Sequence, residues 1–175
     1  MGTGFGKKGM TMIELVTVVA IIGIVLAIAI PTFSRFKAGS KLKGTAMLLY
    51  GDLNFAKIKA METGVSHTVI FGQQIGGTTY AYVVIKDDDA DCEYDDPDED
   101  LLKKVLFTDD YEGISIQKNT LGNNDDGLPA IRFNNKGISK NNTGGFGAGT
   151  ITLQENKYNK TIDVVISSMG RVKIQ

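Results

Sequence analysis

Gly9-Met10-Thr11-Met12-Ile13-Glu14 leads into an apolar run from Leu15 to Ile30, and this stretch decides how the chain is organised. Within the run only Thr17, Gly23 and the small alanines are not strongly apolar. A helix of roughly 20 apolar residues is long enough to cross the hydrocarbon core of a bilayer. Because the run is apolar on all sides, it predicts a helix surrounded by lipid or by other helices.

Glu14 is the only charged residue between Met10 and Ile30. A charged side chain within a membrane helix costs on the order of 2.5–3.5 kcal/mol on insertion scales, so such a residue suggests a function. A carboxylate near the start of the helix can also reach the lipid headgroups by snorkelling. Both interpretations of Glu14 stay open at this point.

The order of the N-terminal parts is unusual for a secretory signal. An ordinary signal peptide has its cleavage site after the apolar core. Here Lys7 and Lys8 precede Gly9, and the apolar core follows. Cleavage after Gly9 would leave the apolar helix on the mature chain and create a positive α-amino group at Met10, four residues before Glu14.

Lys7-Lys8-Gly9 followed by Met10 to Leu15 resembles the class III leader of type IV pilins and type II secretion pseudopilins. The resemblance implies that a prepilin peptidase cleaves between Gly9 and Met10 and N-methylates Met10, where the family usually has phenylalanine. It identifies Glu14 with the family's assembly glutamate and Pro31 with its helix-disrupting proline. In a filament, Glu14 would pair with the Met10 amine of a neighbouring subunit, and a buried charge that is tolerable only when paired would fix the register.

The helix is predicted to continue beyond Pro31. Proline removes a helical hydrogen bond and crowds the preceding turn, so we expect a kink or loosening between Gly23 and Pro31. The basic residues from Arg35 to Lys43 are interpreted as a collar facing the headgroups, and Thr63-Gly64 predicts the end of the helix. Apolar residues at alternating spacings of four and three predict one buried face: Leu42, Ala46, Leu49, Leu53, Ala56 and Ala60.

Beyond Gly64 the apolar period changes to two, and clusters of Gly, Asn and Asp separate short segments. Many short strands without intervening helices predict an antiparallel sheet or sandwich. The predicted fold class is α+β: residues 1–9 are a leader, 10–63 a long helix (membrane or filament core 10–34, amphipathic 35–63) and 64–175 a β-rich domain. The predicted strands are Ser66–Phe71, Thr79–Ile85, Lys104–Phe107, Ile114–Gln117, Ala130–Phe133, Thr150–Gln154, Thr161–Ser167 and Arg171–Ile174.

The C-terminal part carries a second resemblance. Ile131 to Gly137, Gly149 to Leu153 and Val165 to Ile174 resemble the C-terminal half of the GspH/FimT group, which comprises minor pseudopilins of type II secretion and minor pilins of type IV pili. Some FimT-type pilins have a basic Gly-Arg-x-Arg-like motif linked to DNA binding, and Gly170-Arg171-Val172-Lys173 departs from it in the last residue. Arg171 and Lys173 are therefore candidate DNA-binding residues, although alternating basic residues are also typical of an exposed edge strand.

A dense acidic run extends from residue 87 to residue 100. Clustered carboxylates suit calcium, and Asp87, Asp89 and Asp91 are the candidate ligands. The run lacks the order of an EF-hand loop, and blocks of like charge are usually solvated. We therefore predict a solvated loop and no metal site, with calcium as the weaker alternative.

No enzyme active site is predicted. The single histidine, His67, and the single cysteine, Cys92, make neither a zinc site nor an internal disulfide, and no nucleophile elbow or phosphate loop is present. Cys92 lies among acidic residues, which disfavour a reactive thiolate. No cofactor is expected.

The sequence thus predicts a structural subunit of a type IV pilus or a type II secretion pseudopilus, most consistent with a minor pilin or minor pseudopilin acting in assembly, initiation or at the tip. Its expected partners are other pilins or pseudopilins, the prepilin peptidase and the inner membrane, with the β domain in the periplasm or on the cell surface. The alternatives are a DNA-binding or adhesive tip pilin, and a major pilin or simple single-pass anchored domain.

Overall fold

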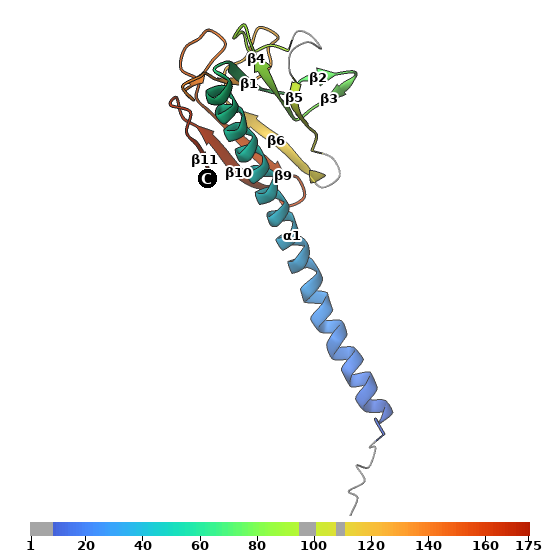
Figure 1. Ribbon diagram of the computed structural model, residues 1–175. Coiled ribbons are helices and arrows are strands. Elements are labelled where there is room, and N and C mark those ends of the chain that lie inside the picture. Colours follow the sequence, from blue (N-terminus) through green and yellow to red (C-terminus); the bar gives the residue numbers. More distant parts are fainter. Residues whose placement is uncertain (1–8, 95–100, 108–110) are drawn as a thin grey trace, which may run out of the picture. The chain divides into compact units, whose positions relative to one another are not determined.

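The computed structural model describes residues 9–94, 101–107 and 111–175 (Figure 1). The predicted leader, residues 1–9, lies outside the described residues except for Gly9. The described part of the chain forms one long helix, α1 (Met12–Thr63), followed by strands only. The strands are β1 (Ser66–Phe71), β2 (Gln74–Ile75), β3 (Thr78–Thr79), β4 (Tyr82–Asp87), β5 (Leu101–Val105), β6 (Ile114–Asn119), β7 (Ala130–Phe133), β8 (Ser139–Lys140), β9 (Gly149–Glu155), β10 (Lys160–Ile166) and β11 (Val172–Ile174).

The chain divides into two compact units, residues 1–37 and residues 38–175. In the first unit every residue from Gly9 to Phe33 is exposed. The described chain contains one helix that is long and apolar enough to cross a membrane, and its apolar part belongs to this unit. An isolated helix of this composition has no core of its own, so it needs lipid or other helices around it.

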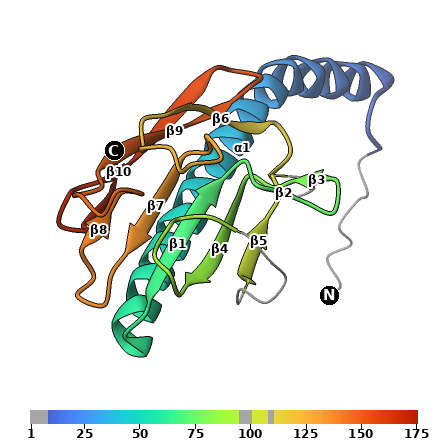
Figure 2. The same ribbon diagram turned by 90° about the horizontal axis from the view of Figure 1, so that it is seen from above.

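The second unit contains two antiparallel sheets. One has the strand order β5-β4-β1-β7-β8 and the other the order β11-β10-β9-β6, while β2 and β3 form a small hairpin. All strand pairs are antiparallel. Figure 2 shows β1, β4, β5 and β7 alongside the helix, and Figure 1 shows β6, β9, β10 and β11 next to the same part of the helix. The predicted α+β class, a long helix packed on antiparallel β structure, is confirmed.

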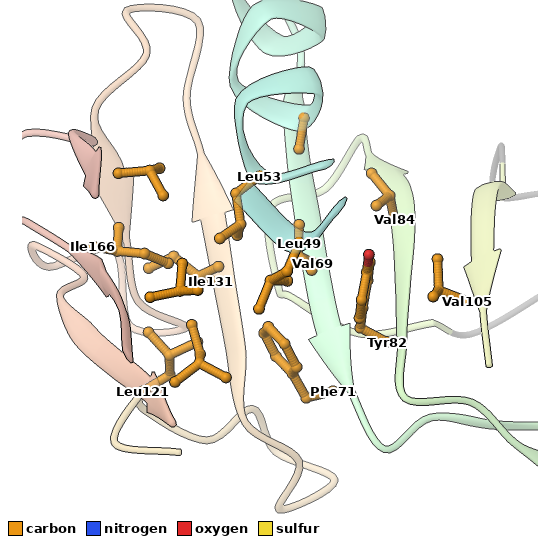
Figure 3. Packing of buried hydrophobic residues seen from close by; sticks show 14 of the residues in the cluster. Leu49, Leu53, Val69, Phe71, Tyr82, Val84, Val105, Leu121, Ile131 and Ile166 are labelled. Carbon is orange, nitrogen blue, oxygen red and sulfur yellow. The ribbon is translucent and has the colours of Figure 1, made fainter. Parts of the chain in front are cut away.

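The core lies between the helix and both sheets. Leu49 and Leu53 project into a cluster with Val69 of β1, Ile131 of β7 and Ile166 of β10 (Figure 3). The whole face predicted from the sequence spacing is buried: Leu42, Ala46, Leu49, Leu53, Ala56 and Ala60. All buried side chains of the described residues lie between positions 42 and 172. A fragment starting at Ala38 therefore keeps the complete core and is expected to fold without the apolar part of the helix.

A second, smaller apolar cluster covers the other face of the five-stranded sheet. Cys92 packs there against Ile70, Val83, Ile85 and Ala130. The prediction of a solvated acidic loop is therefore wrong for Asp87 and Cys92, which are fully buried, whereas Asp88 and Asp89 are exposed. The reason is that the sheet exposes apolar side chains on its outer face, and the segment after β4 covers them. Residues 95–100 of the predicted loop lie outside the described residues.

Several predicted element boundaries need correction. β1 and β7 have the predicted bounds, but β4 begins at Tyr82 rather than Thr79, because Thr78–Thr79 pairs with Gln74–Ile75 in the hairpin. β5 begins at Leu101 rather than Lys104, since Leu101 pairs with Ile85. The two-residue strands β2, β3 and β8 were not predicted because they are too short to show a period of two.

The helix ends as the sequence predicts. Its last residue is Thr63, and Gly64 has a φ of 77°, a conformation that a glycine adopts without steric cost. The region from Gly23 to Pro31 lies within the helix without interruption. The loosening expected there is thus absent from the described chain. Loosening within a filament stays a prediction.

Candidate functional site

Thr11 and Glu14 form a reciprocal cap at the start of the helix. A carboxylate oxygen of Glu14 accepts hydrogen bonds from the backbone N–H of Thr11 and from its hydroxyl, both at 2.9 Å. The hydroxyl of Thr11 in turn accepts a 3.3 Å bond from the backbone N–H of Glu14. This is the capping box, in which two N–H groups without helical partners are satisfied by side chains.

The cap provides the Glu14 carboxylate with hydrogen-bond donors from its own chain. Because the Thr11 hydroxyl and backbone N–H both donate to one carboxylate oxygen, part of the hydrogen-bonding capacity of the Glu14 carboxylate is satisfied within its own chain. Met10 is 64% exposed, next to the cap. The role of Thr11 was not predicted, although the Thr-x-x-Glu pattern that signals a capping box is present in the sequence.

The polar side chains of the apolar part of the helix satisfy themselves locally. The Thr17 hydroxyl donates to the carbonyl of Ile13 at 2.7 Å, and the Thr32 hydroxyl donates to the carbonyl of Ile28 at 3.0 Å. Such bonds remove the cost of a free hydroxyl in lipid. Pro31 lies beside a shallow hollow of about 350 Å³, which Ala27 and Arg35 also line. Since Pro31 has no N–H, the carbonyl of Ala27 loses its helical partner at this hollow.

Asp52 connects the second half of the helix to two strands. The carboxylate is 3% exposed and accepts a 2.7 Å hydrogen bond from the Tyr82 hydroxyl of β4. Lys103 of β5 donates to the other carboxylate oxygen and forms an ion pair with it. A buried carboxylate is tolerated only with such partners. This cluster was not predicted, because an aspartate on a mostly apolar helix face carries no sequence signal of its partners.

The candidate calcium ligands come close together in the structure. One carboxylate oxygen each from Asp87, Asp89 and Asp91 lies within 4.8 Å of the others. Asp87 already accepts hydrogen bonds from the Thr68 hydroxyl at 2.6 Å and from the backbone N–H groups of Asp91 and Cys92 at 3.2 and 3.3 Å. These bonds give Asp87 a structural role in holding the segment after β4. The calcium alternative stays a prediction.

Cys92 is buried as a neutral thiol. Burial raises its pKa from 9.0 to about 11, the neighbouring Arg132 opposes the rise, and Asp87 adds to it. Reactive thiols have lowered pKa values and exposed sulfur atoms. The interpretation of Cys92 as unreactive therefore has a physical basis.

Lys173 lies on the exposed face of β11, and the exposed Arg171 directly precedes this strand. The structure brings Lys57 of the helix close to them, and the three residues line a groove of about 620 Å³ together with Tyr50, Asn54, Val172 and Ile174. Lys57 donates to the carbonyl of Gly170 at 3.0 Å, which holds the start of β11 against the helix. We call Lys57, Arg171 and Lys173 the basic edge. The participation of Lys57 was not predicted, because it is 114 positions away from Arg171 in the chain.

Two sequence models of protein families match the chain. The family described as type II transport protein GspH matches residues 45–170, which include part of the helix and nearly all of the β domain. The prokaryotic N-terminal methylation motif matches residues 5–30, which include Gly9, Met10 and Glu14. The two matches together span both units of the chain.

Two individual proteins resemble the chain. Over 35 residues it is 65% identical to the type IV major pilin protein PilA of Myxococcus xanthus strain DK1622, but this stretch covers only 20% of the chain and 16% of that protein. The crystal structure of the type IV minor pilin FimU of Pseudomonas aeruginosa strain PAO1 has a TM-score of 0.54 at 15% identity, covering 80% of this chain and 92% of FimU. That identity shows a shared fold alone. Because the GspH model covers most of its length, the chain belongs to the GspH family of type IV pilin-like proteins.

Proposed function

We propose that the protein is a filament subunit, a minor pilin or minor pseudopilin, whose apolar helix rests in the inner membrane until assembly. The observation that carries the proposal is the start of the helix. The capped Glu14 and the first, lipid-compatible part of the helix both lie within residues 5–30, the segment that matches the methylation motif. The β domain would lie in the periplasm or on the cell surface and take part in assembly, initiation or tip contacts.

The proposed mechanism uses cleavage between Gly9 and Met10. Cleavage and N-methylation leave a positive amine at Met10, and a neighbouring subunit's Glu14 is its natural partner in a low-dielectric bundle. The cap from Thr11 lets the carboxylate exist in the membrane before assembly. When a subunit docks, the positive Met10 amine comes to lie against a carboxylate that until then has only hydrogen bonds.

The intact mass of the mature protein tests the processing step. We expect the mass of residues 10–175 plus one methyl group, and no processing when Gly9→Val blocks the site. Gly6→Val is the matched control, since it changes a leader glycine outside the cleavage position and should be processed normally. A mature protein that retains residues 1–9 would rule out the pilin pathway.

Incorporation into filaments tests the role of Glu14. We expect Glu14→Gln to enter the membrane normally and to be depleted from the sheared filament fraction. Thr11→Val separates the helix-capping role of Glu14 from its proposed pairing role, because the variant removes the Thr11 hydroxyl and leaves the charge of Glu14 in place. If both variants are depleted equally, Glu14 acts only as a helix cap and the pairing mechanism is wrong.

DNA binding by Arg171 and Lys173 is the competing function. The structure places these two cations and Lys57 around one groove, but phosphate binding requires only positive charge within reach. The open edge of β11 along this groove favours a peptide strand as the ligand over nucleic acid.

A further inference from the structure

We propose that the groove beside β11 binds an extended acidic segment of a neighbouring filament subunit, which adds to the four-stranded sheet as a fifth strand. The inference rests on the proposed function and names the kind of contact that the β domain makes. Three features of the described residues carry it: the open sheet edge, the basic edge and the shape of the groove.

The open edge follows from the strand order. β11 is the last strand of the sheet β11-β10-β9-β6. Asp163 and Gln175 exchange both backbone hydrogen bonds, at 3.0 and 2.8 Å, and Ser167 donates to the carbonyl of Arg171 at 2.9 Å. Because hydrogen-bonded and non-hydrogen-bonded pairs alternate in an antiparallel ladder, the N–H and C=O groups of Val172 and Ile174 point away from β10. They face the side on which this sheet has no further strand among the described residues.

The groove lies on that same side. Tyr50, Asn54 and Lys57 of the helix form one wall, and residues 171–174 of the chain form the other. Its volume of about 620 Å³ accommodates several residues of an extended chain. Strand addition to such an edge takes its affinity from main-chain hydrogen bonds and its specificity from the alternate side chains.

The positive charges of the basic edge favour an acidic ligand strand. Arg171, which directly precedes β11, and Lys173 within it are both exposed, and side chains two positions apart in an extended segment lie on one face. Lys57 faces the groove from the helix. Opposite charges on directly paired residues stabilise a strand pair, and like charges destabilise it. The favoured ligand strand therefore has acidic residues at alternate positions.

The same edge discriminates against nucleic acid. Val172 and Ile174 present carbonyl oxygens as well as N–H groups along the groove. A peptide strand satisfies both, whereas a phosphate backbone offers mainly acceptors and leaves the carbonyls unpaired. Single-stranded nucleic acid sites also combine positive charge with several stacking aromatic side chains, and Tyr50 is the one aromatic residue in this lining.

The test uses the fragment from Ala38 to Gln175, which contains the complete core, and a labelled peptide of residues 88–96 with Cys92→Ser. This peptide has acidic residues at 89, 91, 93 and 95 with uncharged residues between them at 90, 92 and 94, and a further aspartate at each end, Asp88 and Asp96. We expect saturable binding in fluorescence anisotropy. The double variant Arg171→Glu/Lys173→Glu should weaken it about tenfold or more. The double variant Lys118→Glu/Lys136→Glu is the matched control for net charge and should bind like the wild type.

A second set of variants tests whether the peptide pairs with β11 through main-chain hydrogen bonds. Ile174→Pro removes an outward N–H and keeps the residue on an edge where proline is tolerated, so we expect about fivefold weaker binding. Ile174→Val keeps the N–H and should bind normally. A peptide N-methylated at alternate residues keeps its charges and should lose binding.

Three results would overturn the inference: no binding of the peptide, equal binding of the N-methylated peptide, or tighter binding of a labelled DNA oligonucleotide. These results concern the edge alone. Failure of the filament proposal would instead appear in the mass and incorporation experiments, so the two failures are distinguishable.

Discussion

The hydroxyl of Tyr82 in β4 donates a 2.7 Å hydrogen bond to the carboxylate of Asp52 on the helix. Lys103 of β5 holds the other carboxylate oxygen. One buried aspartate thus joins the helix to two strands of the five-stranded sheet. Pulling on the apolar end of the helix within a filament would load this connection between helix and sheet.

Tyr82→Phe tests the strength of that connection. The variant removes only the hydroxyl and leaves Asp52 with one partner fewer in a buried place. Because hydrogen bonds to charged groups are worth roughly 1.5–3 kcal/mol, we expect the free energy of unfolding of the fragment from Ala38 to fall by about that amount in urea titrations. Tyr50→Phe is the control, since Tyr50 is 40% exposed and should change stability by no more than about 0.5 kcal/mol.

Because burial raises the pKa of the Cys92 thiol, we predict that the free energy of unfolding falls at alkaline pH. Its thiol has a folded-state pKa of about 11 against 9.0 for the free thiol. The folded state therefore keeps its proton longer, and this contribution to stability is fully present below about pH 9 and lost as the pH rises to 11. Its size is roughly 2–3 kcal/mol. Urea titrations at several pH values should show the decline, and Cys92→Ala should flatten it between pH 9 and 10.

Ionisation of Tyr82 contributes a further loss of folding stability at still higher pH. Burial raises its pKa, and so does the hydrogen bond to Asp52. The sign is the same as for Cys92: stability is present below the unfolded pKa of about 10 and falls above it. A Cys92→Ala protein that shows no residual decline above pH 10 would contradict the buried pairing of Tyr82 with Asp52.

Gly170 sets the start of β11, and a pair of alanine variants tests this. A Cβ at Gly170 would lie 2.1 Å from the carbonyl oxygen of Gly137, and the residue has a φ of 73°. Gly144 has a similar φ of 78° but open space around it. We expect Gly144→Ala to cost about 1–2 kcal/mol, and Gly170→Ala at least about 1–3 kcal/mol more because of the overlap. Equal losses would mean that the β11 turn is not tightly packed.

The fold was largely predictable where one pattern dominates. The spacing from Leu42 to Ala60 identified the buried helix face because a single helix packs one side against the domain. The bounds of β1 and β7 were predicted because both are short segments between clear glycine or asparagine signals. The division into two sheets was not, because pairing partners such as β1 and β7 lie some 60 residues apart and strand sequences do not encode their neighbours.

The candidate sites were predictable only in part. Gly9, Met10 and Glu14 lie in a linear motif that can be recognised without coordinates, and the processing and assembly roles of these residues and of Pro31 stay predictions. That Lys57 lies around one groove with Arg171 and Lys173 could not be predicted, because only the folded chain brings these residues together. The burial of Asp87 and Cys92 contradicted their acidic surroundings in the sequence, since hydrophobic cover of the sheet outweighed the local charge pattern.

Zero-length crosslinking of assembled filaments tests the central claim most directly. A carbodiimide joins an amine to a carboxylate only where the two are already in contact. We predict a product of two-subunit mass, linked between the Met10 amine of one subunit and Glu14 of its neighbour or the corresponding pair with another pilin, and its loss in Glu14→Gln. Filaments that contain the protein but give no crosslink at Met10 or Glu14 would contradict the account.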